Sequence, residues 1–175
     1  MTNGRVLVLS GVSGSGKTAV GRNLAQTLGW RFIEGDRFHS DANREKMQRG
    51  EPLNNTDRLP WLQRLHEEIS ACLASGERAV LACSALKKSY RLYLSVVPEC
   101  VRFVLLSGDF KLIQNRLQQR RGHFMNPALL RSQFDALEIS ADLQLVDIDQ
   151  PIEHIVSAVI ETLGDWTQTD GEGST

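Results

Sequence analysis

The sequence has few cysteines, and their spacing differs from that of disulfide-rich or zinc-binding proteins. Three occur in 175 residues: Cys72, Cys83 and Cys100. Their number is odd, and no two of them form a C-x-x-C pair. A disulfide framework and a zinc site are therefore both disfavoured, and a reducing cytoplasm is the expected location.

Long apolar runs and a strong net charge are also missing. The apolar run at positions 6–9 has four residues, which is too short for the core of a signal peptide. No stretch approaches the length of a membrane span. The formal net charge is −1, so no overall field attracts nucleic acid or an anionic membrane. We expect neither of them as a partner.

A glycine-rich loop lies between this apolar run and a helix-forming stretch. Gly11, Gly16, Lys17 and Thr18 match G-x-x-x-x-G-K-[ST], the phosphate-binding P-loop. Glycines let backbone N–H groups surround an anion, and a helix N-terminus adds partial positive charge. We expect Lys17 to reach the β/γ-phosphates and the Thr18 hydroxyl to bind Mg²⁺. The residues expected to hold a nucleoside triphosphate are Gly11, Val12, Ser13, Gly14, Ser15, Gly16, Lys17 and Thr18.

Two other interpretations of this loop exist. One is a glycine-rich turn without a ligand. The other is a dinucleotide fingerprint, because Gly14-x-Gly16-x-x-Ala19 fits G-x-G-x-x-G/A and an acidic residue, Glu34 or Asp36, follows about 20 residues later. A dinucleotide loop has no use for a Lys-Thr pair, so the P-loop interpretation is preferred.

Apolar runs alternate with helical patterns along the chain. Strands are expected at 5–10, 30–33, 79–83, 101–106 and 143–148, and helices at 17–28, 41–49, 56–75, 88–97, 110–120, 127–137 and 151–163. The strands are almost continuously apolar, which is typical of a parallel sheet covered on both faces. The prediction is a three-layer α/β P-loop NTPase fold with a five-stranded parallel sheet. One kinase domain would span 1–164, and 165–175 would form a disordered tail.

Missing motifs narrow the class of P-loop protein. A guanine-reading N/T-K-x-D is absent, and the only D-x-x-G lies at Asp170 to Gly173. The third strand ends in Cys83-Ser84, whereas motor and transporter ATPases have Asp or Asp-Glu there. What remains is the plan of small kinases such as the nucleoside-monophosphate kinases. In that plan an acceptor-binding insertion, here about 37–60, follows the second strand, and an arginine-bearing lid, here about 116–127, closes the site.

Acidic and basic residues stand where this plan needs them. Asp36 follows the second strand, at the sheet edge where ligands of α/β proteins bind. We expect it to orient the acceptor hydroxyl for attack on the γ-phosphate, or alternatively to cap a helix. Glu34 is a candidate for holding a magnesium-bound water or is a solvated strand-end acid. Arg116 and Arg120 share a helix face and are expected to neutralise the transferring phosphoryl group, unless they form an ordinary solvated basic face.

Several runs together resemble the gluconokinases, relatives of the shikimate and nucleoside-monophosphate kinases. The resemblance extends from the first strand to about Pro151. It rests on Gly11–Thr18, Glu34-Gly35-Asp36, His39, Asn43-x-x-Lys46-Met47-x-x-Gly50-x-Pro52-Leu53-Asn54-x-x-Asp57-Arg58-x-Pro60-Trp61-Leu62, Cys83-Ser84-Ala85-Leu86-Lys87-Lys88-x-Tyr90-Arg91 and Arg120-x-Gly122-His123-Phe124. Two positions depart from the family pattern: Glu34 replaces a frequent Asp, and Ser40 replaces a common Pro.

The resemblance implies phosphorylation of D-gluconate by ATP, with Mg²⁺, at the terminal hydroxyl, giving 6-phospho-D-gluconate. It also implies a homodimer. A kinase for a related sugar acid and a non-catalytic nucleotide-binding regulator are the alternatives. The implied catalytic residues are Lys17, Asp36, Arg116 and Arg120. The implied substrate residues are Asp36, His39, Arg44, Arg58, Ser84, Lys87, Arg91 and His123, and Gln150 is assigned to the adenine side.

Overall fold

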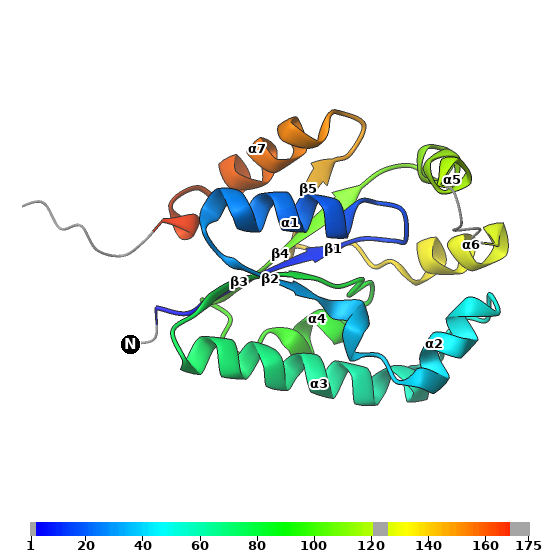
Figure 1. Cartoon of the computed structure of the whole chain (residues 1–175), viewed down its shortest axis with the longest axis horizontal. Helices are drawn as coiled ribbons and strands as arrows, with labels where there is room; N and C mark the ends of the chain where they lie inside the picture. Colours follow the sequence, from blue (N-terminus) through cyan, green and yellow to red (C-terminus); the bar gives the residue numbers. More distant parts are fainter. Residues whose placement is uncertain (1–2, 121–125, 169–175) are drawn as a thin grey trace, which may run out of the picture.

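The computed structural model describes residues 3–120 and 126–168, and it has a central sheet between two layers of helices (Figure 1). The strands are β1 (Arg5–Ser10), β2 (Arg31–Glu34), β3 (Arg78–Ala82), β4 (Val101–Ser107) and β5 (Leu143–Asp147). Their order is β2-β3-β1-β4-β5, and every neighbouring pair is parallel. The prediction of a five-stranded parallel α/β sheet is confirmed.

The helices of the described residues are α1 (Lys17–Leu28), α2 (Asp41–Gln48), α3 (Asn55–Ala74), α4 (Lys88–Leu94), α5 (Phe110–Gln119), α6 (Pro127–Ala136) and α7 (Ile152–Leu163). Two short 3₁₀ helices are η1 (Gly35–Phe38) and η2 (Gly164–Thr167). In Figure 1, α1 and α7 lie on one side of the sheet, and α3 and α4 lie on the other. Within these residues, no helix combines the length and apolar character that a membrane span requires.

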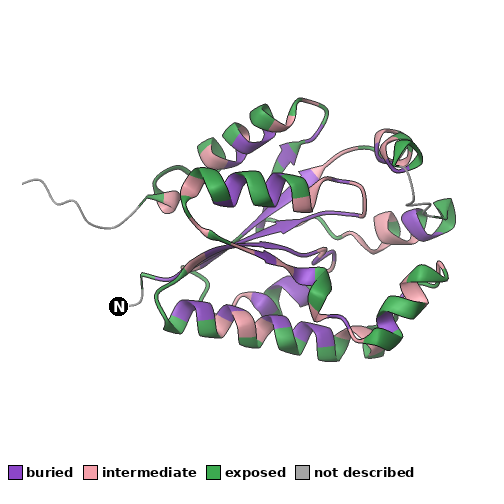
Figure 2. Cartoon of the chain, viewed as in Figure 1, coloured by how far each residue is buried: buried purple, intermediate pink, exposed green. Residues whose placement is uncertain are grey.

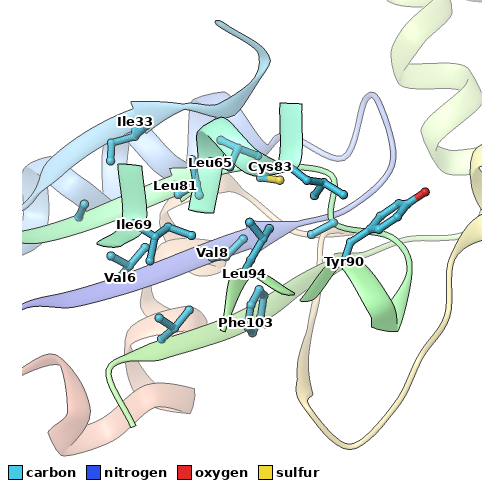
Figure 3. Packing of buried hydrophobic residues seen from close by; sticks show 14 of the residues in the cluster. Val6, Val8, Ile33, Leu65, Ile69, Leu81, Cys83, Tyr90, Leu94 and Phe103 are labelled. Atoms are coloured by element: carbon cyan, nitrogen blue, oxygen red, sulfur yellow. The ribbon is translucent and has the colours of Figure 1, made fainter. Parts of the chain in front are cut away.

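Alternation along the central strand explains the two layers. Val6 and Val8 of β1 face the cluster formed with α3 and α4, which Figure 3 shows around Leu65, Ile69 and Leu94. The alternate β1 residues, Leu7 and Leu9, belong to a second cluster with α1 and α7. Successive side chains of a strand point to opposite faces, so burial on both faces requires a continuous apolar run. In Figure 2 the three central strands, β3, β1 and β4, are accordingly coloured mostly as buried, whereas the edge strands β2 and β5 are more exposed.

Helix α3 begins earlier than the sequence suggested, because a different residue caps it. The Asn54 side chain accepts the Asp57 N–H, and the Asp57 carboxylate accepts the Asn54 N–H, which forms a capping box. Thr56, at which the sequence predicted the start of this helix, lies inside it. The other boundaries match the prediction or differ by at most three residues, the largest shift being at the end of α4.

The predicted disordered tail is wrong for its first residues. Residues 165–168 include most of η2, where Trp166 packs edge-on against Trp30 at 5.9 Å and donates its indole N–H to the Glu99 carbonyl. The Arg5 guanidinium donates to the carbonyls of Trp166 and Gln168. An isolated Trp in a polar stretch therefore marked a packed segment. Residues 169–175 lie outside the described part of the chain.

Candidate functional site

The P-loop joins the end of β1 to the start of α1, as the sequence predicted. Gly14 has φ +81° and Gly16 has φ +95°, in the left-handed region that favours glycine. A Cβ on Gly14 would approach the Leu117 Cγ within 2.7 Å, so α5 packs directly on the loop. No side chain caps the N-terminus of α1. The amide donors of its first turn remain available, which fits an anionic ligand such as a phosphate.

Lys17 is the first residue of α1, and its side chain folds back onto the P-loop. Its ammonium donates to the carbonyls of Gly11 and Val12 at 2.9 and 3.0 Å. Burial lowers the pKa of Lys17, whereas the nearby acids Asp36 and Glu34 act in the opposite direction. A partly buried ammonium that bonds only neutral carbonyls is well suited to bind an anion.

Thr18 and Glu34 lie together at the start of α1 and the end of β2. The Thr18 hydroxyl donates to the Glu34 carboxylate at 2.6 Å. Asp36 follows two residues after Glu34 and lines the same pocket as Thr18. Within residues 3–120 and 126–168, no group of three or more His, Cys, Asp or Glu side chains could hold a metal by itself. Oxygen donors in this small number suit Mg²⁺, which keeps several waters and shares phosphate ligands.

Asp36 is held at the rim of the pocket by its tightly packed neighbour. Gly35 is buried, and a Cβ there would lie 2.4 Å from the Ala82 carbonyl oxygen of β3. The Gly35 carbonyl accepts the Trp61 indole N–H at 2.9 Å. The side chain that caps the next helix, α2, is Ser40 and not Asp36. The capping alternative for Asp36 is therefore wrong for α2, and its exposed carboxylate is free to serve the pocket.

One pocket of about 800 Å³ brings the two halves of the site together. Its walls come from the P-loop, from η1 and α2, and from the ends of α5 and α6. Lys17, Asp36, Arg44 and Arg120 all contribute to it together with four predicted residues of the P-loop, so eight of the predicted residues share one space. The remaining lining residues are Ser13, Gly14, Gly16, Thr18, Ala19, Met47, Gln48, Arg49, Gly50, Leu117, Asn126 and Leu129.

A second cationic cluster lies between α3 and α4. The Arg58 guanidinium and the Lys87 ammonium lie 5.9 and 5.7 Å from the centre of the Tyr90 ring. The Tyr90 hydroxyl and Lys87 both donate to the Asn55 side-chain oxygen. Within the described part of the chain, neither Arg58 nor Lys87 has a carboxylate at ion-pair distance. The two cations are therefore available to bind an anionic ligand.

The predicted contact between Arg91 and the substrate is wrong. Its side chain has 0% exposure and pairs with Asp142 at 2.6 Å. The guanidinium also donates to Ser140 and to three carbonyls, those of Ala85, Leu86 and Glu138. A buried guanidinium whose donors are all used has none left for a ligand. Arg91 instead fixes the loop that follows β3.

His39 is also turned into the protein. Its ring stacks on Trp61 with centroids 4.4 Å apart, and only 7% of the residue is exposed. Burial lowers the pKa of His39 to about 4; Asp36 opposes the shift, and Arg58 and Arg44 add to it. The imidazole is therefore neutral near pH 7, and it contacts the Trp61 ring of α3.

Arg116 and Gln150 lie at the end of β5, away from the pocket lining. Arg116 donates to the Ile148 carbonyl at 2.6 Å, and the Gln150 amide donates to the Asp147 carbonyl at 2.7 Å. The structure thus separates Arg116, which lies in α5, from Arg120, which follows the helix as its extended C-cap, so the predicted shared helix face is not formed. Arg116 is not among the pocket-lining residues.

Two further predicted residues complete the account. The Ser84 carbonyl accepts from the Ser10 hydroxyl at 2.5 Å and from the Gly11 N–H at 3.3 Å, so Ser84 links the loop after β3 to the P-loop through its backbone. Its side chain is not among the pocket-lining residues. His123 lies outside the described residues.

Sequence reasoning missed some residues of the site. Met47 and Gln48 line the pocket three and four positions after Arg44, so helical spacing could have found them. Gln133 of α6 bonds the P-loop residue Ser13. No local pattern marks a glutamine that lies 120 residues from its partner.

Comparisons with known proteins identify the family to which the chain belongs. The AAA domain family model matches residues 6–141. A probable gluconokinase of Rattus norvegicus is 46% identical, over 90% of this chain and 97% of its own length. The thermoresistant gluconokinase of Escherichia coli is 43% identical, over 90% and 93%. The crystal structure of a gluconokinase from Sinorhizobium meliloti is 40% identical with a TM-score of 0.83, covering 93% of both chains. The chain belongs to the gluconokinase family of P-loop kinases.

Proposed function

We propose that the protein transfers the γ-phosphoryl group of ATP to the terminal hydroxyl of D-gluconate, giving 6-phospho-D-gluconate and ADP. The relatives named as gluconokinases supply the substrate class. The observation that carries the proposal is the single pocket that Lys17, Asp36, Arg44 and Arg120 share. In this proposal the cations bind the phosphates and the Asp36 carboxylate serves the acceptor.

The donor side acts by position and charge. The β- and γ-phosphates lie over the amide donors at the start of α1, and Lys17 exchanges its carbonyl partners for phosphate oxygens. Arg120 lies in the same pocket and neutralises charge on the transferring group. Arg116 and Gln150 lie at the end of β5 and serve the nucleoside side instead.

Magnesium fits beside Thr18. The Thr18 hydroxyl would hold the ion directly, and Glu34, already bonded to that hydroxyl, would accept from a coordinated water. When bound, the ion neutralises the phosphates and holds them in line. Glu34 has one more methylene than the Asp common at this position, which suits contact through water.

Asp36 serves the acceptor. Its carboxylate accepts the hydrogen of the terminal hydroxyl, and the hydroxyl oxygen attacks the γ-phosphorus as that proton passes to Asp36. The bond to the β-phosphate oxygen breaks, and its electron pair leaves with ADP. The pocket allows this attack because Asp36 and Lys17 line it together.

Arg58 and Lys87 bind the carboxylate end of the acceptor in this proposal. Both are cations without a carboxylate partner in the described part of the chain, and Tyr90 and Asn55 beside them offer polar groups to a polyol. Arg58 and Asp36 both act electrostatically on the buried His39. One extended sugar acid would reach from one to the other.

The family resemblance also supports a homodimer in a reducing cytoplasm. All three cysteines are free thiols in the structure, which suits that compartment. Light scattering of the purified protein would give the mass of the dimer or of the monomer, and a monomer at micromolar concentration would contradict the proposed assembly.

ADP release with a panel of acceptors tests the reaction. D-gluconate should stimulate release strongly, and D-glucitol, which has a neutral CH₂OH in place of the carboxylate, should not. Stimulation by another sugar acid alone would move the substrate to that acid. ATP binding without any acceptor-dependent release would instead favour the non-catalytic regulator.

Two charge-removing variants test the carboxylate site. Arg58→Gln and Lys87→Gln should each raise KM for gluconate about tenfold or more, since each removes a charge-assisted bond, and leave KM for ATP unchanged. Lys88→Gln is the matched control, because Lys88 is an exposed neighbour on α4. Unchanged KM values for gluconate in both variants would contradict this part of the proposal.

A further inference from the structure

Gln133 of helix α6 holds the P-loop with both ends of its side-chain amide. The Ser13 backbone N–H donates to Gln133 Oε1 at 2.7 Å. Gln133 Nε2 donates to the Ser13 hydroxyl oxygen at 3.1 Å. Two bonds from one planar group to one residue fix the relative position of α6 and the loop.

The backbone partner settles the orientation of this amide. A backbone N–H can only donate, so the atom that faces it has to be the amide oxygen. The nitrogen therefore faces the Ser13 hydroxyl, and it can only donate as well. Ser13 Oγ is thus an acceptor toward Gln133, and its own hydrogen has to point elsewhere.

The pocket is the place where that hydrogen can be used. Ser13 lines the pocket together with Gly14, Gly16 and Lys17. Within the described part of the chain, Ser13 Oγ donates to no acceptor. Phosphate oxygens are strong acceptors, and bonds from hydroxyl groups to charged oxygens are among the stronger hydrogen bonds in proteins.

We propose that the Ser13 hydroxyl donates a hydrogen bond to a phosphoryl oxygen of bound ATP, and that Gln133 is the positioning residue that orients this hydroxyl. The P-loop motif leaves position 13 unspecified, so this contact is a feature of the chain and not of the motif. Gln133 contacts no phosphate itself in this arrangement.

Helix α6 is rigid enough for this task. Leu130, one turn before Gln133, is 1% exposed, and Phe134 packs edge-on against Phe110 of α5 at 5.5 Å. The amide therefore projects from a packed helix. A rigid support lowers the entropy lost when the hydroxyl is aligned.

The experiment measures binding of a non-hydrolysable ATP analogue to the full chain by calorimetry, without acceptor. The inference rests on the proposed ATP site but not on gluconate as the substrate. Ser13→Ala should weaken binding about tenfold, since it removes a bond to a charged group. Gln133→Met keeps the length of the side chain but makes neither bond, and should weaken binding several-fold, about three- to tenfold.

Gln133→Glu separates positioning from simple support. The introduced carboxylate still accepts the Ser13 N–H, so a purely structural role would make this variant milder than Gln133→Met. In our proposal it also accepts the Ser13 hydroxyl hydrogen and adds negative charge beside the phosphates. Binding should then be weaker than in Gln133→Met.

A double variant and a remote control complete the design. Ser13→Ala in the Gln133→Met background should cost little more than Ser13→Ala alone, because both changes remove the same oriented hydroxyl. Gln144→Met, an exposed position on the edge strand β5, should bind like the wild type.

Several results would overturn the inference. They are Ser13→Ala binding within twofold of the wild type, additive effects in the double variant, or Gln133 variants that lower only the melting temperature. A wild-type protein that does not bind the analogue would overturn the proposed function as well. Wild-type binding with unaffected variants would overturn this inference alone.

Discussion

The donor and acceptor sides of the pocket are constructed differently. The donor side is built mainly from eight consecutive residues, Gly11–Thr18, which supply backbone groups and one lysine, and Arg120 joins them from the end of α5. The acceptor side takes Asp36 from η1, Arg44 from α2, and Arg58 and Lys87 from α3 and the segment before α4. The first depends on local backbone geometry, whereas the second depends on how separate elements pack. Single side-chain substitutions can therefore change which acceptor binds, whereas nucleotide binding depends on the backbone of the whole loop.

Removal of the P-loop lysine should have the largest effect on turnover. Lys17→Ala should lower kcat by roughly 10²–10³-fold, since it removes a preorganised charge from the transferring phosphate. Stability should change little, because the Lys17 ammonium bonds only carbonyls of its own loop. ADP release and a thermal melt measure the two effects. Near-normal turnover would mean that the donor side does not depend on this residue.

Arg91 tests whether a family-typical residue on the acceptor side binds substrate or supports the loop. Arg91→Leu should lower the free energy of unfolding by about 3–5 kcal/mol, because it breaks a buried ion pair and leaves carbonyls without donors. Urea titration measures the loss. Arg102→Leu, on an exposed position of β4, is the control and should change it by less than about 0.5 kcal/mol. A fully stable Arg91 variant with a raised KM for gluconate would restore the substrate role.

Asp36 tests whether the acceptor side contributes to chemistry as well as to binding. Asp36→Asn keeps the size of the side chain but accepts a proton poorly, and kcat should fall by about 10²-fold or more. KM for ATP should stay close to the wild-type value, since the P-loop is intact. Asp41→Asn, an exposed acid at the start of α2, should leave kcat unchanged. An unchanged kcat in Asp36→Asn would mean that Asp36 lines the pocket without taking part in proton transfer.

His39 gives the smallest effect, which depends on pH. Burial lowers its pKa in the folded protein to about 4, while the unfolded chain has about 6.5. Between these values the unfolded state binds the extra proton, so stability is complete above pH 6.5 and declines as the pH falls toward 4. The slope from this group is at most about 1.4 kcal/mol per pH unit.

A non-titrating ring separates this contribution from the rest. His39→Phe keeps a ring against Trp61 but cannot bind a proton, so its stability should fall less steeply between pH 6.5 and 4. Urea titrations at several pH values measure both slopes. Parallel pH profiles for the variant and the wild type would show that His39 does not contribute.

Sequence reasoning succeeded where structure is local. The bounds of β1 and α1 match the prediction, because an apolar strand, a glycine loop and a helix start are all encoded by neighbouring residues. Asp36 and Lys17 were also placed correctly at one edge of the sheet, since parallel strands end together.

Residue roles failed where a distant partner decides them. Arg91 has its partner Asp142 51 residues away, and Arg116 has Ile148 32 residues away. A guanidinium can serve a ligand, a carboxylate or a carbonyl, and only packing selects among them. A residue can belong to a family motif because it supports the fold or because it contacts the substrate. A match to the motif therefore does not tell these two roles apart.

The strand order has a consequence for how the chain folds. The P-loop follows directly after β1. In the described sheet, β1 pairs with β3 and β4, which begin at Arg78 and Val101. The segment that binds the nucleotide therefore has no sheet neighbour until about 70 to 100 further residues exist, and closing such long loops slows folding. At about 5–20 residues per second of synthesis, β1 waits several seconds for its partners. The residues of the nucleotide site are thus synthesised early, but they can fold into their final geometry only after β3 and β4 have been made.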